Sequence, residues 1–200
     1  NIELSYNTNF SVLEYKSYNL VDYWKHFKEV KIGASIDLIG EQSNYVRHGM
    51  EYDVLEQNYF KIKDIKGIDF RITSILHFLN VFNLPQLQQH WIENIGLNAS
   101  KLSFNILIQP EEQQLSVLPY EYKNIARETI EKHIEFLEEY SNTEHLIDSW
   151  HKAITVMYSQ NDSYLLAKFF KLNDDKDNIR HQKFEIYFPE YGELRNYVIH

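Results

Sequence analysis

The sequence has no cysteine, and it contains only six glycines and four prolines in 200 residues. The lack of cysteine excludes a disulfide scaffold, a thiolate zinc site, a cysteine nucleophile and a cysteine-held iron–sulfur cluster within these residues. Few glycines and prolines, with no Gly/Ser-rich linker, favour one continuous compact chain over two tethered domains. At about 150 residues per domain, we expect one domain with at most a small appendage.

Long apolar runs and surplus positive charge are also missing. No stretch approaches the ~18 apolar residues of a membrane span, and the first ten residues lack the features of a signal peptide. Twenty Lys and Arg against twenty-nine Asp and Glu give a net charge of −9, whereas nucleic-acid-binding domains carry a surplus of Lys and Arg. We therefore expect a cytoplasmic protein with no membrane and no nucleic-acid partner.

The sequence does contain a regular alternation of strand and helix patterns. Four β-like runs cover residues 2–7, 31–37, 68–74 and 102–108, and helical patterns between them cover 18–28, 52–65 and 85–96. Strand starts roughly 30 to 37 residues apart match the size of a βαβ unit. This alternation predicts a parallel sheet whose strands lie side by side in chain order.

The pattern changes after the fourth strand. Helices are predicted over residues 119–140 and 143–158, a shorter one over 163–170, and residues 172–200 form a tail expected to pack back onto the body. The predicted fold class is α/β. A partial (βα) barrel of about four parallel strands with outer helices spans residues 1–118, and a helical C-terminal region that packs on it spans 119–200.

The four predicted strands have one apolar and one polar face, because strand side chains alternate faces with period two. Leaving a buried polar group unpaired costs roughly 1 to 3 kcal/mol, so these groups must pair or meet water or a ligand. One interpretation is a solvated face with some internal ion pairs, for example at Asp69. The other is the concave lumen of an open barrel that holds a polar ligand near the carboxyl ends of the strands. The polar face comprises Glu3, Ser5, Asn7, Asn9, Gly33, Ser35, Asp37, Asp69, Arg71, Thr73, Ser103, Asn105, Leu107 and Gln109.

Acid–base and metal chemistry find less support in the pattern. A hydrolase or isomerase with Asp37 as its acid or base is one alternative. Asn9, Ser74 and Gln109 occupy the corresponding strand ends, so a carboxylate pair for hydrolysis is missing. None of the nine histidines forms an H-x-x-x-H or H-E-x-x-H motif, and we predict no metal site.

Several segments resemble the radical S-adenosylmethionine (radical SAM) superfamily. Residues 34–40 (ASIDLIG) and 44–49 (NYVRHG) are similar to a strand end and its following loop in that family. Thr8 and Asn9 resemble the "TN" that ends the preceding strand, and residues 80–85 (NVFNLP) resemble the turn after the next one. The closing segments of twitch-domain members are similar to residues 115–119 with Lys123, and to Asp177, Arg180, Phe184 and residues 188–190.

The resemblance spans almost the whole chain and aligns its strands with the third to sixth of a six-stranded partial barrel. It implies that the first two strands, with the cysteine loop that holds a [4Fe–4S] cluster, are missing. Because the chain opens at Asn1 directly in a strand-like run, we expect the natural polypeptide to start further upstream. SAM and [4Fe–4S] would then be cofactors of the full-length parent, which would modify a peptide or a small molecule, and no cofactor is expected in this chain.

The resemblance also implies roles for individual residues. Ser35 would bind the ribose or amino acid portion of SAM and Arg47 its carboxylate, while Asp37, Asn9 and Thr73 would line the same cavity. We expect Asn105 and Gln109, on the fourth strand and just after it, to contact substrate.

Three function classes follow. The first is a catalytically inactive fragment of a radical SAM-like enzyme, the second a non-catalytic module that binds a small polar ligand, and the third the Asp37 enzyme. Exposed sheet edges also predict self-association, with two half-barrels face to face.

Overall fold

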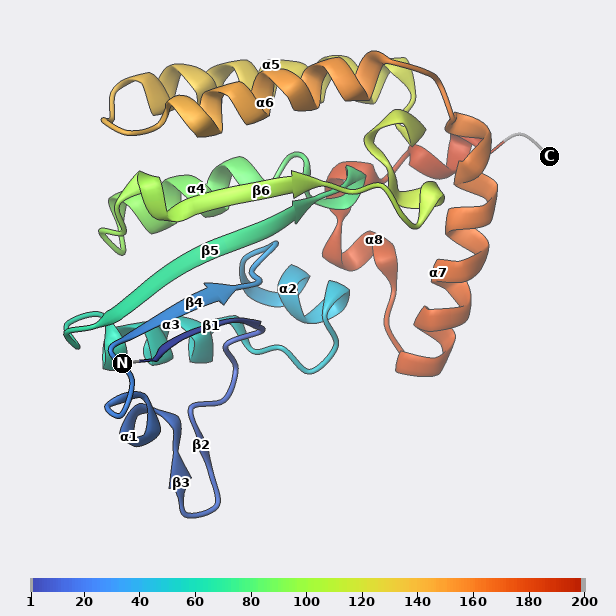
Figure 1. Cartoon of the computed structure of the whole chain (residues 1–200). Coiled ribbons are helices and arrows are strands. Elements are labelled where there is room, and N and C mark those ends of the chain that lie inside the picture. The colour runs from blue at the N-terminus through green and yellow to red at the C-terminus, as the bar shows by residue number, and fades with distance from the viewer. Residues whose placement is uncertain (1, 199–200) are drawn as a thin grey trace.

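Four parallel strands form one sheet in the order β1-β4-β5-β6, as Figure 1 shows. The computed structural model describes residues 2–198. The strands are β1 (Glu3–Thr8), β4 (Glu29–Ala34), β5 (Ile68–Leu76) and β6 (Leu102–Ile106). Their order follows the chain, which confirms the predicted α/β fold. The sheet is open, and no closed barrel occurs within residues 2–198.

Helices cover one face of the sheet. Helices α3 (Tyr52–Ile62) and α4 (Leu84–Glu93) lie behind it in Figure 1, whereas none of the helices in residues 2–198 covers the near face. The ring of Phe70 on β5 lies 5.0 Å from Tyr59 of α3 and 5.9 Å from Trp91 of α4, between ring centroids. In β4 every second residue is buried. The predicted division into an apolar and a polar face is therefore confirmed.

The connection from β1 to β4 differs from the prediction of a helix over residues 18–28. It contains a small antiparallel hairpin of β2 (Glu14–Tyr15) and β3 (Tyr18–Asn19), followed by the short helix α1 (Leu20–Trp24). Lys16 turns the hairpin with a φ of 54°, and the Asn19 side chain caps α1 by accepting from the Val21 amide at 2.9 Å. Helix α2 (Gly40–Val46) is a further element that the sequence pattern did not predict.

Helices α5 (Tyr120–Glu138) and α6 (Glu144–Tyr158) form an antiparallel pair along the β6 side of the sheet, at the top of Figure 1. Both were predicted. Trp150 of α6 is fully buried and its ring lies 4.6 Å from Phe104 of β6. Its indole Nε1 donates to Oε1 of Gln88 on α4 at 3.0 Å. This contact fixes the helix pair to both the sheet and α4.

The remaining helices cover the carboxyl ends of the strands. Helix α7 (Leu166–Arg180) runs ten residues past the predicted end at 170, and α8 (Phe184–Tyr187) follows it. The segment does pack back onto the body, since Phe188 and Tyr191 are buried and the Tyr191 hydroxyl donates to the Phe78 carbonyl. Short 3₁₀ turns lie at Phe78–Asn80, Ala99–Lys101, Glu111–Gln113, Leu115–Val117, Ser163–Leu165, Pro189–Tyr191 and Leu194–Tyr197.

Candidate functional site at the carboxyl ends of the strands

Asp37 is the centre of a buried polar cluster just after β4. Its side chain is 6% exposed, and Oδ2 accepts from Nε and Nη2 of Arg47 at 2.8 and 2.7 Å. Oδ1 accepts from the Ile75 amide at 2.7 Å. The carboxylate thus joins the end of β4 to the end of α2 and to β5. Two of the residues singled out in the sequence, Asp37 and Arg47, do meet.

Asn80 and His77 complete this cluster after the end of β5. The Asn80 amide nitrogen donates to the carbonyls of Asp37 at 3.2 Å and Ile75 at 2.9 Å, and its oxygen accepts from the His77 amide at 2.9 Å. His77 is 4% exposed, and its Nδ1 has no hydrogen-bond partner among residues 2–198. Burial lowers the pKa of His77 to about 4. The ring is therefore neutral at pH 7, and its Nδ1 is a buried polar atom without a partner among the described residues.

This arrangement favours a positioning role for Asp37. A general acid or base needs an oxygen within reach of the substrate proton, but both carboxylate oxygens are already engaged. Arg47 retains more freedom, since its side chain is 34% exposed and its hydrogen bonds use only Nε and Nη2. The cluster can therefore offer a guanidinium edge, held in place by Asp37, to an anionic group.

The other predicted cofactor residues lie on the strands or directly after them. Ser35 follows β4, and its amide donates to the Thr8 carbonyl at 2.8 Å. The Asn9 side chain is turned toward Ser11, whose amide and hydroxyl donate to it at 3.3 and 2.9 Å. Thr73 on β5 lies 3.3 Å from the Ser103 hydroxyl on β6. No hydrogen bond between described side chains joins Ser35, Asn9 and Thr73 to one another.

The two predicted substrate residues lie further along the sheet. Asn105 is exposed on β6 and lines a groove beside α6. Gln109 is exposed in the loop that follows, directly before Pro110. Both are separated from Asp37 by the width of β5, because β5 lies between β4 and β6. A molecule that touched Asp37 and Asn105 together would have to lie across the sheet.

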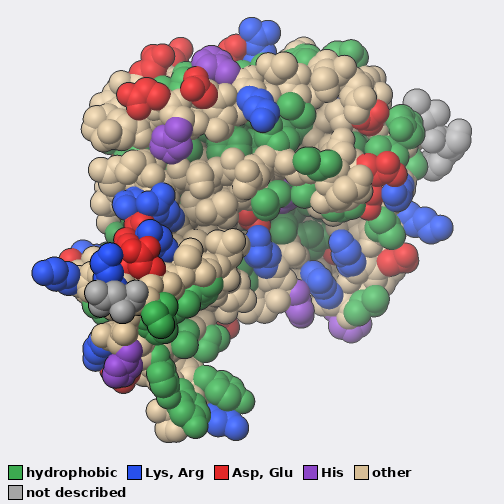
Figure 2. Space-filling view, viewed as in Figure 1, with side chains coloured by type: hydrophobic (Ala, Val, Ile, Leu, Met, Phe, Trp, Pro, Cys, Tyr) green, Lys and Arg blue, Asp and Glu red, His purple; other side chains and the backbone are tan. Residues whose placement is uncertain are grey.

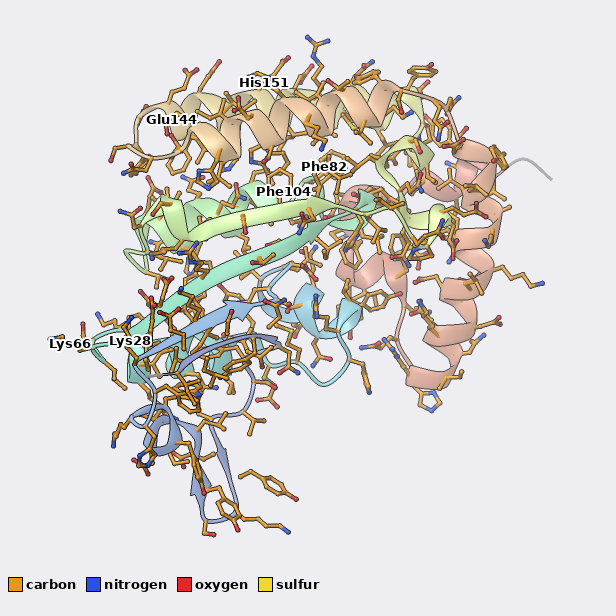
Figure 3. All side chains as sticks on the ribbon, viewed as in Figure 1. Lys28, Lys66, Phe82, Phe104, Glu144 and His151 are labelled. Atoms are coloured by element: carbon orange, nitrogen blue, oxygen red, sulfur yellow. The ribbon has the colours of Figure 1, made fainter. Side chains whose placement is uncertain are left out.

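The amino ends of the strands carry ion pairs. Glu3 pairs with Lys28 at 3.3 Å and Lys31 at 3.5 Å, and Asp69 pairs with Arg71 at 2.8 Å and Lys101 at 2.6 Å. Burial raises the pKa of Asp69, but the hydrogen bonds from Lys101 and Arg71 outweigh it and hold the pKa below its ordinary value. Figure 2 shows acidic and basic groups side by side there, and Figure 3 labels Lys28 at this end. The internal ion pair predicted at Asp69 is present.

No family model, curated protein or solved structure matches this chain. The assignment of a function therefore depends on the geometry described above. Within residues 2–198, no three His, Asp or Glu side chains come together to form a metal-binding group. None of the helices in that range combines the length and apolarity that crossing a membrane requires.

His77 and Asn80 are the two residues at this site that sequence reasoning missed. His77 directly follows β5 and Asn80 ends the 3₁₀ turn after it, at the end of a parallel sheet where ligands bind. That position was the available signal. The apolar residues around them, in the sequence LHFLN, made the segment look like ordinary core.

Proposed function

We propose that the uncovered face of the sheet is one wall of a SAM-binding cavity of the radical SAM type, and that this chain alone binds without catalysing a reaction. The observation that carries the proposal is the continuous polar face. On the four parallel strands the polar side chains point to the same uncovered side, with the exception of Ser74 on β5, which is buried. In parallel sheets, ligands bind at the carboxyl ends of the strands, where Asp37 and Arg47 meet.

The residues at this edge suit the two polar parts of SAM. The free edge of the Arg47 guanidinium would hold the carboxylate of the methionine portion, because guanidinium offers five N–H donors and Asp37 occupies only part of them. The hydroxyl of Ser35, which lies two residues before Asp37, would bind a ribose hydroxyl. Asp37 acts through Arg47 by fixing the direction of its side chain.

The donor set does not fit an iron–sulfur cluster, because the chain has no cysteine. In radical SAM enzymes, reductive cleavage of SAM takes an electron from such a cluster. The proposal for this chain is therefore limited to binding. The free edge of β1 is consistent with a cavity that further strands would complete. In the described range β1 pairs with β4 on one side and has no strand on the other.

Isothermal titration calorimetry with SAM tests the proposal. We expect Ser35→Ala and Arg47→Ala each to weaken binding about tenfold, the effect of losing one hydrogen bond of about 1.4 kcal/mol, and the double variant to abolish it. Ser141→Ala, an exposed serine in the turn between α5 and α6, is the matched control. Circular dichroism of each variant shows whether the fold is kept.

Titrations with adenosine and with methionine distinguish a SAM site from a module that binds another small polar ligand. If SAM produces no heat at millimolar concentration while adenosine or methionine does, the face is a module for another small polar ligand. If SAM binds equally to the wild type and the double variant, its site lies elsewhere and the proposal is wrong.

A further inference from the structure

A groove of about 730 Å³ runs along the free side of β6, between that strand and α6. This volume lies within the roughly 300 to 1,000 Å³ of typical ligand sites. Three of its lining residues, Ser149, Lys152 and Val156, are spaced three and four apart and so share one face of α6. In Figure 3 the label of Phe104 marks the strand just below α6. The complete lining is Phe104, Asn105, Ile106, Leu107, Ile108, Gln114, Ser149, Lys152 and Val156.

The backbone of β6 presents unpaired groups to this groove. Backbone groups of successive residues in a strand point alternately to its two sides. The Leu107 amide donates to the Leu76 carbonyl of β5 at 2.8 Å, so residue 107 faces the sheet. The Leu102 carbonyl, on the opposite side, is bonded by His145 of α6 at 2.8 Å. The same alternation turns the N–H and C=O of Phe104 and Ile106 toward the groove, where the described residues supply them with no partner.

The groove side of the sheet lacks the charges that usually protect an edge strand. Glu3 and its partners Lys28 and Lys31 flank the opposite edge at β1, but β6 itself carries no charged residue. Ile108 beyond its end is 76% exposed. The single cation of the groove is Lys152, and no carboxylate in residues 2–198 lies within ion-pair distance of it.

We propose that the free side of β6 binds an extended peptide segment, which adds a strand to the sheet and places an acidic side chain against Lys152. Main-chain hydrogen bonds to Phe104 and Ile106 supply the affinity in this mode of recognition, and side-chain contacts supply the selectivity. The unpaired Lys152 selects a carboxylate, and Ile106, Ile108 and Val156 offer apolar contact to the neighbouring side chains. This inference does not depend on SAM binding, because the groove lies at a different strand edge from Asp37.

Fluorescence anisotropy with designed peptides tests the inference on the full chain. The probe is a labelled eight-residue peptide of alternating valine and threonine with one central glutamate. Its matched control carries N-methyl groups on alternate backbone amides. These groups replace the N–H hydrogens that would bond to β6 and leave the side chains unchanged. We expect the plain probe to bind and the N-methylated probe to bind at least tenfold more weakly.

Two variants of the protein test the two parts of the inference. Ile106→Pro removes the outward N–H at a position where an edge strand tolerates proline, and we expect it to weaken binding at least tenfold. Lys152→Glu replaces attraction by repulsion, and we expect about a tenfold loss that a probe with lysine in place of glutamate reverses. Lys132→Glu on the exposed side of α5 is the control and leaves the affinity unchanged.

Three outcomes would overturn the inference. The first is absence of binding of the plain probe to the wild type at millimolar concentration. The second is equal affinity for the plain and N-methylated probes. The third is concentration-dependent assembly in light scattering that Ile106→Pro abolishes, because the strand edge would then belong to a second copy of this chain and not to a peptide.

Discussion

Replacing Asp177 should release the C-terminal helices from the rest of the molecule. The carboxylate of Asp177 on α7 is 8% exposed. Its Oδ1 accepts from the Tyr45 hydroxyl of α2 at 2.7 Å, and its Oδ2 accepts from the Phe184 amide at the start of α8 at 2.7 Å. Asn173 donates to the same Tyr45 hydroxyl at 2.7 Å. One side chain therefore joins three helices.

The magnitude follows from these two bonds. A hydrogen bond to a charged group contributes about 1.5 to 3 kcal/mol, so Asp177→Ala forfeits roughly 3 to 6 kcal/mol in gross terms. Relief from burying a carboxylate returns part of this, and we expect a net loss of about 3 kcal/mol in the free energy of unfolding. For a chain of 200 residues this lowers the melting temperature by about 6 to 12 °C. Asp177→Asn keeps one acceptor oxygen and should cost about half as much.

Urea unfolding monitored by circular dichroism measures the loss. Asp175→Ala, at an exposed position on the same helix, is the matched control and should stay within about 0.5 kcal/mol of the wild type. A double-mutant cycle with Tyr45→Phe should give a coupling of about 1 kcal/mol or more. A loss below about 0.5 kcal/mol for Asp177→Ala, or no coupling to Tyr45, would refute the reasoning.

Three further predictions concern other buried polar groups. Burial lowers the pKa of His133 from its ordinary value of 6.5 to about 4. As the pH falls, the unfolded chain therefore binds a proton at this histidine before the folded chain does. The free energy of unfolding should fall by about 2 kcal/mol between pH 7 and pH 5 for this reason. His133→Gln should remove that part of the decline in urea midpoints measured at the two pH values, and an unchanged decline would contradict it. Lys123 is fully buried, and its ammonium donates to a single described group, the Gln160 carbonyl at 2.7 Å. Lys123→Met should leave the melting temperature unchanged or raise it, whereas a fall of more than 5 °C would show that the ammonium stabilises the fold. Asp37→Ala should cost about 2 to 3 kcal/mol in urea unfolding because the Ile75 amide loses its acceptor, and Asp37→Asn should cost less than half of that.

The sheet could be predicted because its strands repeat one pattern at a regular interval. Apolar and polar residues alternate along the strands except at the end of β5, where Ser74 is buried. Three of the four predicted starts lie within one residue of the observed ones. The exception is β4, which begins at Glu29 and not at residue 31. The charged residues Glu29 and Lys31 made the start of this strand look like a loop. Both lie on the polar face of the sheet, where they pair with one another.

Helix α7 shows why periodicity failed in the C-terminal region. Its residues Leu172 and Ile179 are exposed, so its sequence has no continuous apolar stripe to predict a helix beyond residue 170. The buried contacts of this part of the helix are the polar ones that Asn173 and Asp177 make with Tyr45. Such a helix is specified by partners more than 120 residues away along the chain, and a local window of sequence does not contain them.

The candidate site was predictable in part. Resemblance pointed to Asp37 and Arg47, and the structure brings them within hydrogen-bond distance. It did not indicate that Asp37 also accepts from the Ile75 amide. Every residue except proline has a main-chain N–H, so the residue type at position 75 does not reveal such a partner. His77 was missed for a related reason, since a lone histidine after a strand is more often a core residue than a functional one.

The bond between the Tyr191 hydroxyl and the Phe78 carbonyl has a consequence for synthesis on the ribosome. The two residues are 113 positions apart, and at about 5 to 20 residues per second the ribosome needs roughly 6 to 23 s to make the intervening chain. During that time the carboxyl ends of β4 and β5 lack their C-terminal cover. A nascent chain in this state exposes Phe78 and its apolar neighbours, which makes it a target for chaperones until Tyr191 has been made.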